Sequence, residues 1–126
     1  MDFTTIMEEL IKFRDDRDFK QFHTTKNLTM SICIEATKLL ETFQWRNDER
    51  IDQIVENDKA NIEDKLANIL IYAMYLCHNL GINDTSIEAA IYSRIIKEST
   101  NMHLTCHREI PLNKPDSNII ELGNKE

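Results

Sequence analysis

Residues that interrupt helices are scarce in this sequence, which has only two glycines and two prolines among 126 residues. Both residue types are unfavourable inside helices, because proline removes a hydrogen-bond donor and glycine loses the most backbone freedom on folding. Their scarcity favours long helices and excludes collagen-like and Pro/Gly-rich disordered chains. With 41% hydrophobic residues, the sequence predicts a compact helical protein of one-domain size.

A long apolar run is also missing. The longest run, over residues 69–77, is far shorter than the about 20 residues that span a bilayer, so no membrane partner is expected. No apolar run follows a basic start, which argues against a signal peptide. The cysteines number three, and an odd count favours reduced thiols in a cytoplasmic protein.

Positively charged residues are in the minority. The sequence has 15 lysines and arginines and 22 aspartates and glutamates, which gives a net charge of −7. Nucleic acid polymers are bound by basic surfaces, so this balance excludes them as the main partner. A small nucleotide held in a local pocket is compatible with it.

Apolar residues recur at helical spacing in four segments. The sequence therefore predicts helices over residues 4–17, 27–44, 59–80 and 85–99, with residues 46–58 forming a short helix or a helical linker. Residues suited to cap three of these helices are Thr4 or Thr5, Asn27 or Thr25, and Thr85 in a Thr85-x-x-Glu88 capping box.

The third predicted helix is apolar almost all round from Leu66 to Cys77. A helix of this kind is buried on most sides, and a chain this small has little core to surround it. The surplus apolar surface therefore predicts burial against a second subunit.

Helical periodicity ends near residue 100. We therefore expect a helical domain over residues 1–100 and an irregular C-terminal tail over residues 101–126. This tail contains His103, Cys106 and His107. We interpret them as part of a solvated turn, because a structural zinc site needs four ligands and the rest of the chain supplies no second half.

Two segments carry a family resemblance: FKQFHTTKNLTMSICIEATKLLETFQW over residues 19–45 and IEDKLANILIYAMY over residues 62–75. Together they resemble the MazG-type nucleotide pyrophosphohydrolases, the all-α NTP pyrophosphatases that include dCTP pyrophosphatases. The resemblance covers roughly residues 3–98. It implies an all-α, four-helix MazG-like bundle, a homodimer or homotetramer, and a nucleoside triphosphate, especially a dNTP, as ligand.

The resemblance also implies a magnesium site, made in the family by E-x-x-E on one helix and E-x-x-D on a later one. The matching positions here are Glu35 and Lys38, then Lys65 and Asn68. Three of the four ligands are changed, and two are cations. Magnesium would bridge carboxylates and phosphates and activate water, but Glu35 with Asn68 beside two ammonium groups is a poor site for it.

Two interpretations of the lysines stay open. Lys38 and Lys65 pair with Glu35 and Glu41 in a buried ion network, or they bind phosphate directly without a metal. Arg94 stands where the family has a lysine and is a third candidate for phosphate binding.

A rearranged metal site is the enzymatic alternative, and its ligands would be Glu35, Glu41, Asp64 and Asn68. Glu41 and Asp64 are close in sequence to the family positions, but neither has the helical phase of a family ligand.

Residues placed around the nucleobase by the resemblance are Phe22, His23, Asn27, Trp45 and Tyr72. Bases stack on aromatic side chains, although buried aromatics more commonly serve a core or an interface.

The metal positions, the lysines and the base residues together leave three candidate functions. They are a nucleotide-binding protein with hydrolysis weakened or lost, an active magnesium-dependent (d)NTP pyrophosphatase, and a non-catalytic structural or regulatory dimerisation module.

Overall fold

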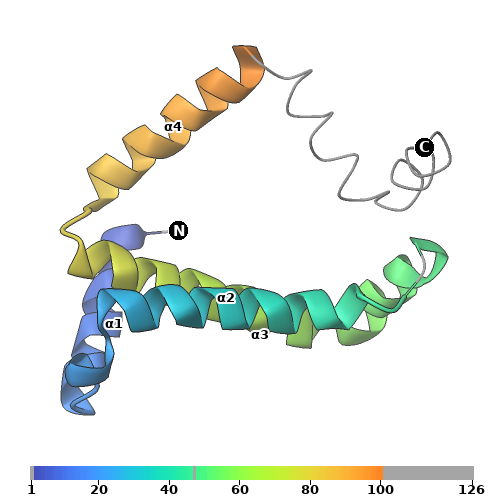
Figure 1. The fold of residues 1–126 in the computed structure, drawn as a ribbon, viewed down its shortest axis with the longest axis horizontal. Helices are drawn as coiled ribbons and strands as arrows, with labels where there is room; N and C mark the ends of the chain where they lie inside the picture. Colours follow the sequence, from blue (N-terminus) through green and yellow to red (C-terminus); the bar gives the residue numbers. More distant parts are fainter. Residues whose placement is uncertain (1, 47, 101–126) are drawn as a thin grey trace, which may run out of the picture. The chain divides into compact units, whose positions relative to one another are not determined.

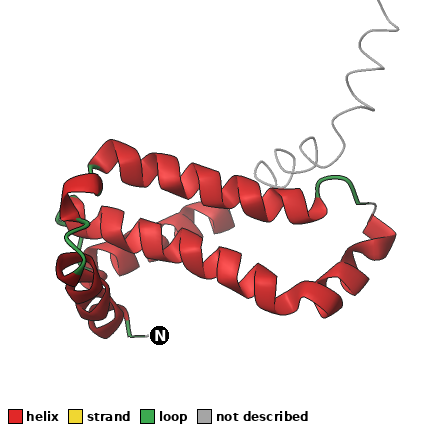
Figure 2. Cartoon of the chain, turned by 90° about the horizontal axis from the view of Figure 1, so that it is seen from below, coloured by secondary structure: helices red, strands yellow, loops and turns green. Residues whose placement is uncertain are grey.

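The structure is a computed structural model that describes residues 2–46 and 48–100. These residues form α1 (Phe3–Asp16), the short 3-10 helix η1 (Lys20–Phe22), α2 (Thr25–Phe43), α3 (Asp48–Asn79) and α4 (Asp84–Thr100). The described part of the chain contains four α-helices and no strand (Figures 1 and 2). The all-α prediction is confirmed. The predicted tail, with His103, Cys106 and His107, lies outside the described residues.

The first helix begins one residue earlier than predicted, and Asp2 caps it. The Asp2 carboxylate accepts hydrogen bonds from the backbone N–H of Thr5 at 3.3 Å and from its hydroxyl at 2.6 Å. These bonds favour the charged form and hold the pKa of Asp2 below 3.8. The prediction of a Thr4 or Thr5 cap is wrong, because the preceding aspartate competes for the same orphan backbone groups.

The cap of α2 also lies earlier than predicted. Thr24 Oγ1 accepts a hydrogen bond of 3.1 Å from the backbone N–H of Asn27, so the prediction of an Asn27 or Thr25 cap is wrong. The Asn27 side chain instead donates to the carbonyl of Phe22 at 3.1 Å, which ties η1 to the first turn of α2.

The segment predicted as a short helix or linker is the first part of α3. One residue with non-helical backbone, Asp58 (φ −125°, ψ 22°), kinks the helix where the third helix was predicted to begin. Gly81 follows the end of α3 with φ 68°, a conformation that favours glycine. The next helix starts at Asp84, so Thr85 lies inside its first turn rather than before it.

The chain divides into two compact units, Met1–Asp84 and Thr85–Glu126. In the first unit α2 and α3 lie side by side and antiparallel, and α1 contacts α3 near the start of α2 (Figure 1). The described part of the second unit belongs to α4. None of the described helices is long and apolar enough to cross a membrane.

The buried core of the described residues is small. Its buried hydrophobic residues are Leu28, Met74 and Tyr75, and of these only Leu28 is fully buried. Many large apolar side chains are exposed instead, among them two on α2 and two on α3: Met30, Ile34, Leu66 and Leu70. Each pair is four residues apart and therefore lies on one face of its helix. The two central helices thus carry more apolar surface than the first unit buries.

Candidate functional site

Glu35 is the one family carboxylate that the sequence retains, and it is buried in the α2–α3 interface with 8% of its surface exposed. Lys38 Nζ lies 3.0 Å from its Oε1, one turn further along α2. From α3, Asn68 Nδ2 donates a longer bond of 3.4 Å to its Oε2. Both carboxylate oxygens are therefore engaged by protein donors, as expected for a buried charge.

Lys65 has a different partner. Its Nζ donates a 2.8 Å hydrogen bond across the interface to the hydroxyl of Thr42. In the described residues no ion pair joins it to a carboxylate. The two lysines therefore differ: Lys38 neutralises Glu35, whereas the contact of Lys65 leaves its positive charge uncompensated.

The described residues hold no group of three or more His, Cys, Asp and Glu side chains placed to bind a metal ion. The structure thus does not gather Glu35, Glu41 and Asp64 into one cluster. Glu35, bonded to one ammonium group and one amide, does not fit Mg²⁺, which prefers several oxygen ligands of negative charge. No catalytic step through magnesium follows from this arrangement.

An open pocket of about 500 Å³ lies beside Lys65, between the end of α2 and the first half of α3. Its walls are mostly polar and are formed by Glu41, Thr42, Arg46, Arg50, Gln53, Ile54, Asn57, Asp58 and Lys65. Arg46 and Arg50 were not among the site residues predicted from the sequence. The available signal was two basic residues soon after the Phe43-Gln44-Trp45 segment, in a region predicted only as a short helix or a helical linker.

The predicted nucleobase residues do not share one place in the chain. Phe22, His23 and Asn27 lie at the start of α2, whereas Trp45 follows its end. At 1.5 Å per helical residue, His23 and Trp45 are separated by about 30 Å. Trp45 is 84% exposed and does not line the pocket beside Lys65. Within one chain, His23 and Trp45 therefore cannot contact the same base.

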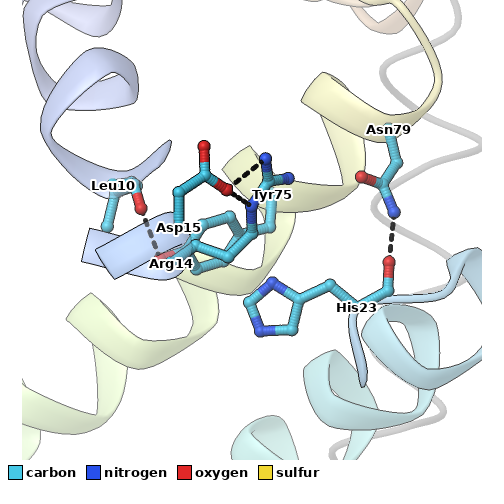
Figure 3. Close-up of polar contacts among 6 residues, drawn as sticks. All are labelled: Leu10, Arg14, Asp15, His23, Tyr75 and Asn79. Atoms are coloured by element: carbon cyan, nitrogen blue, oxygen red, sulfur yellow. Dashed lines mark hydrogen bonds and ion pairs between the residues drawn. The ribbon is translucent and has the colours of Figure 1, made fainter. Parts of the chain in front are cut away.

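His23 belongs to a polar cluster formed with α1 and α3 (Figure 3). Its ring packs on the ring of Tyr75 with centroids 4.5 Å apart, and its carbonyl accepts a hydrogen bond from the Asn79 amide. Its Nδ1 is buried and has no hydrogen-bond partner among the described residues. Burial and the nearby Arg14 guanidinium lower the pKa of His23 below 6.5.

Arg14 and Tyr75 complete this cluster. The arginine is 4% exposed, and its guanidinium pairs with Asp15 at 2.9 Å. The Tyr75 hydroxyl donates to the carbonyl of Leu10 at 2.9 Å, and burial raises the pKa of the phenol above 10. These contacts tie α1 to α3 and hold the His23 ring in place.

The two remaining predicted residues lie elsewhere. Tyr72 is half-buried on α3. Arg94 lies on α4 in the second unit, where its guanidinium pairs with Glu98 one turn away. Arg94 thus has a local acidic partner.

Comparison with known proteins gives a consistent result. The MazG-like family model matches residues 30–105. The dCTP pyrophosphatase 1 of Rattus norvegicus is 35% identical over 72 residues, covering 53% of this chain and 42% of that protein. For the Bos taurus dCTP pyrophosphatase 1 the identity is 34% over 67 residues, covering 52% and 40%. The chain therefore spans less than half the length of these curated relatives.

A solved structure agrees with the sequence relatives. The crystal structure of a pyrophosphatase from Archaeoglobus fulgidus matches with a TM-score of 0.68 and 37% identity, over 77% of this chain and 89% of that one. The family match spans most of α2 and all of α3 and α4, which is more than half of the sequence. On these grounds the chain belongs to the MazG-like family.

Proposed function

We propose that this MazG-like protein binds a nucleoside triphosphate and that its metal-dependent hydrolysis is weakened or lost. One observation carries the proposal. The Glu35 carboxylate is bonded to Lys38 and Asn68, and the remaining family position is the cation Lys65. At the positions that would hold magnesium in a MazG-type enzyme, the one carboxylate is here neutralised by Lys38 on its own helix, and Lys65 adds a further positive charge.

A nucleotide ligand is supported by the family and by the names of the relatives. The curated relatives are dCTP pyrophosphatases, so deoxynucleoside triphosphates are the first candidates. A triphosphate is repelled by bare carboxylates and attracted by cations, so the change from acids to lysines favours binding without a bridging metal.

A homo-oligomer is the second part of the proposal. The exposed apolar side chains Met30 and Ile34 on α2, and Leu66 and Leu70 on α3, form stripes typical of surfaces that pack against another subunit. Because His23 and Trp45 lie at opposite ends of α2, the two residues of one chain cannot contact the same base. A second copy with its α2 antiparallel to the first would bring the two ends together, in a homodimer or in half of a homotetramer.

The cytoplasm is the proposed compartment. Cys33 and Cys77 are free thiols, and unpaired thiols are typical of reducing compartments.

Calorimetric titration with the four dNTPs and four NTPs, in EDTA and again in Mg²⁺, tests this function. We expect at least one nucleoside triphosphate to bind in EDTA, and no appreciable release of pyrophosphate when Mg²⁺ is present. Rapid release of pyrophosphate would instead support the active pyrophosphatase with a rearranged ligand set. Absence of nucleotide binding in both buffers would support the dimerisation module.

A further inference from the structure

We propose that the pocket beside Lys65 is a metal-free cradle for the phosphate chain of the ligand, and that Arg46 and Arg50 supply charge that magnesium supplies in a working pyrophosphohydrolase. This inference rests on the proposed function and names the phosphate-binding part of that site. It replaces two of the phosphate ligands expected from sequence. Lys38 is engaged by Glu35, and Arg94 is paired with Glu98.

The place and size of the pocket suit such a ligand. It opens at the end of α2, directly beyond the family metal positions, and Lys65 belongs both to those positions and to the pocket wall. Its volume of about 500 Å³ falls in the range of small-molecule sites. The kink at Asp58 lies in the same wall, so the bend of α3 contributes to the shape of the pocket.

The charges in the pocket favour an anion. Lys65, Arg46 and Arg50 face the carboxylates Glu41 and Asp58, which leaves a local positive excess in a chain of net charge −7. Among the described residues no ion pair joins these three cations to a carboxylate. Asp58 already accepts a 2.9 Å hydrogen bond from Asn61.

The donor types also match phosphate. Each guanidinium presents two parallel N–H groups that fit two phosphate oxygens, and the Lys65 ammonium acts as a point charge. The amides of Gln53 and Asn57 line the same pocket and add neutral donors. A phosphate chain bound here would bring several charged oxygens to donors supplied by α3 and by the segment that follows α2.

Inorganic tripolyphosphate is the probe that separates phosphate binding from base binding. We would titrate tripolyphosphate and the best-binding dNTP in EDTA into the full chain and into the variants Arg46→Gln and Arg50→Gln. Each variant is expected to lose about tenfold or more in affinity for both ligands, equivalent to one lost charged contact. Lys12→Gln, an exposed lysine on α1 that does not line the pocket, is the matched control and should bind as the parent does. Thermal melts verify that all variants fold.

The outcomes separate this inference from the proposed function. Parent-like affinity of both arginine variants, with dNTP bound by the parent, would overturn the cradle and leave nucleotide binding intact. Tripolyphosphate binding that needs the arginines, without any dNTP binding, would support the cradle and overturn the nucleotide function. Binding of tripolyphosphate only in the presence of Mg²⁺ would overturn the metal-free cradle.

Discussion

Lys38 and Glu35 form an ion pair of 3.0 Å on one face of α2, and the carboxylate is buried while the lysine side chain is 53% exposed. The pair fills two of the four positions at which MazG-type enzymes hold magnesium. A protein cation therefore compensates the retained carboxylate.

Replacing Lys38 with Met should destabilise the fold by about 1–3 kcal/mol, because the buried Glu35 carboxylate would keep only the long contact from Asn68. The exposure of the lysine keeps this cost below that of breaking a fully buried pair. Urea unfolding measures the loss. Adding Glu35→Gln to this variant should recover most of the stability, and a double variant as unstable as the single one would contradict the assigned role.

Replacing Lys65 with Met should reduce nucleotide affinity strongly and the stability of the fold only slightly. Its hydrogen bond to Thr42 is with a neutral hydroxyl, so the free energy of unfolding should fall by no more than about 1.5 kcal/mol. Affinity for a nucleoside triphosphate in EDTA should fall about tenfold or more. Melting curves and one titration decide the case. A loss of about 3–5 kcal/mol would show instead that Lys65 compensates a buried carboxylate.

Restoring the family acids with Lys38→Glu, Lys65→Glu and Asn68→Asp should create a divalent-cation site, because four carboxylates would then converge between α2 and α3. Titration with Mn²⁺ measures the binding, and pyrophosphate release from dNTPs reports any recovered turnover. A control with the same charge change on exposed residues away from α3 is Lys20→Glu, Gln21→Glu and Lys26→Glu. Equal Mn²⁺ affinity in the two proteins would show that the added negative charge alone, and not a specific site, binds the ion.

The lowered pKa of His23 predicts a pH-dependent stability. The folded state disfavours the charged imidazole, because the ring is partly buried near Arg14. The unfolded state therefore binds the proton more readily, so this contribution is complete above pH 6.5 and is lost as the pH falls through the folded-state pKa. Urea unfolding between about pH 5 and pH 7.5 should show the fall, and His23→Gln should flatten it. If the free energy of unfolding of that variant still falls equally with pH, other titratable groups cause the pH dependence.

The exposed apolar stripes predict self-association. Light scattering should give a mass of two or four times the 14.8 kDa of one chain. Leu70→Glu, which places a charge on the stripe of α3, should shift the protein toward monomer because burying an unpaired charge is unfavourable. Glu63→Gln, at an exposed polar position of the same helix, should leave the mass unchanged. A parent protein that is monomeric at micromolar concentration would contradict the proposed assembly.

Local features of the sequence determined the helices. Apolar periodicity and the scarcity of glycine and proline placed all four, and the predicted start at residue 59 coincides with the kink at Asp58. The caps were misplaced because Asp2 and Thr24 compete with neighbouring threonines for the same backbone groups. The i,i+3 spacing also put Lys38 on the face of Glu35, since helical phase alone decides which residues of one helix are neighbours.

Relations between helices were decided by the tertiary structure. The register of α2 against α3 gave Lys65 a hydroxyl rather than a carboxylate and brought Asn68 to Glu35. The same packing formed a pocket that includes Arg46 and Arg50, two residues of the segment predicted from sequence as a short helix or a helical linker. The physical reason is that helical periodicity fixes neighbours within one helix. The sliding and rotation of one helix on another depend on how all their side chains fit together.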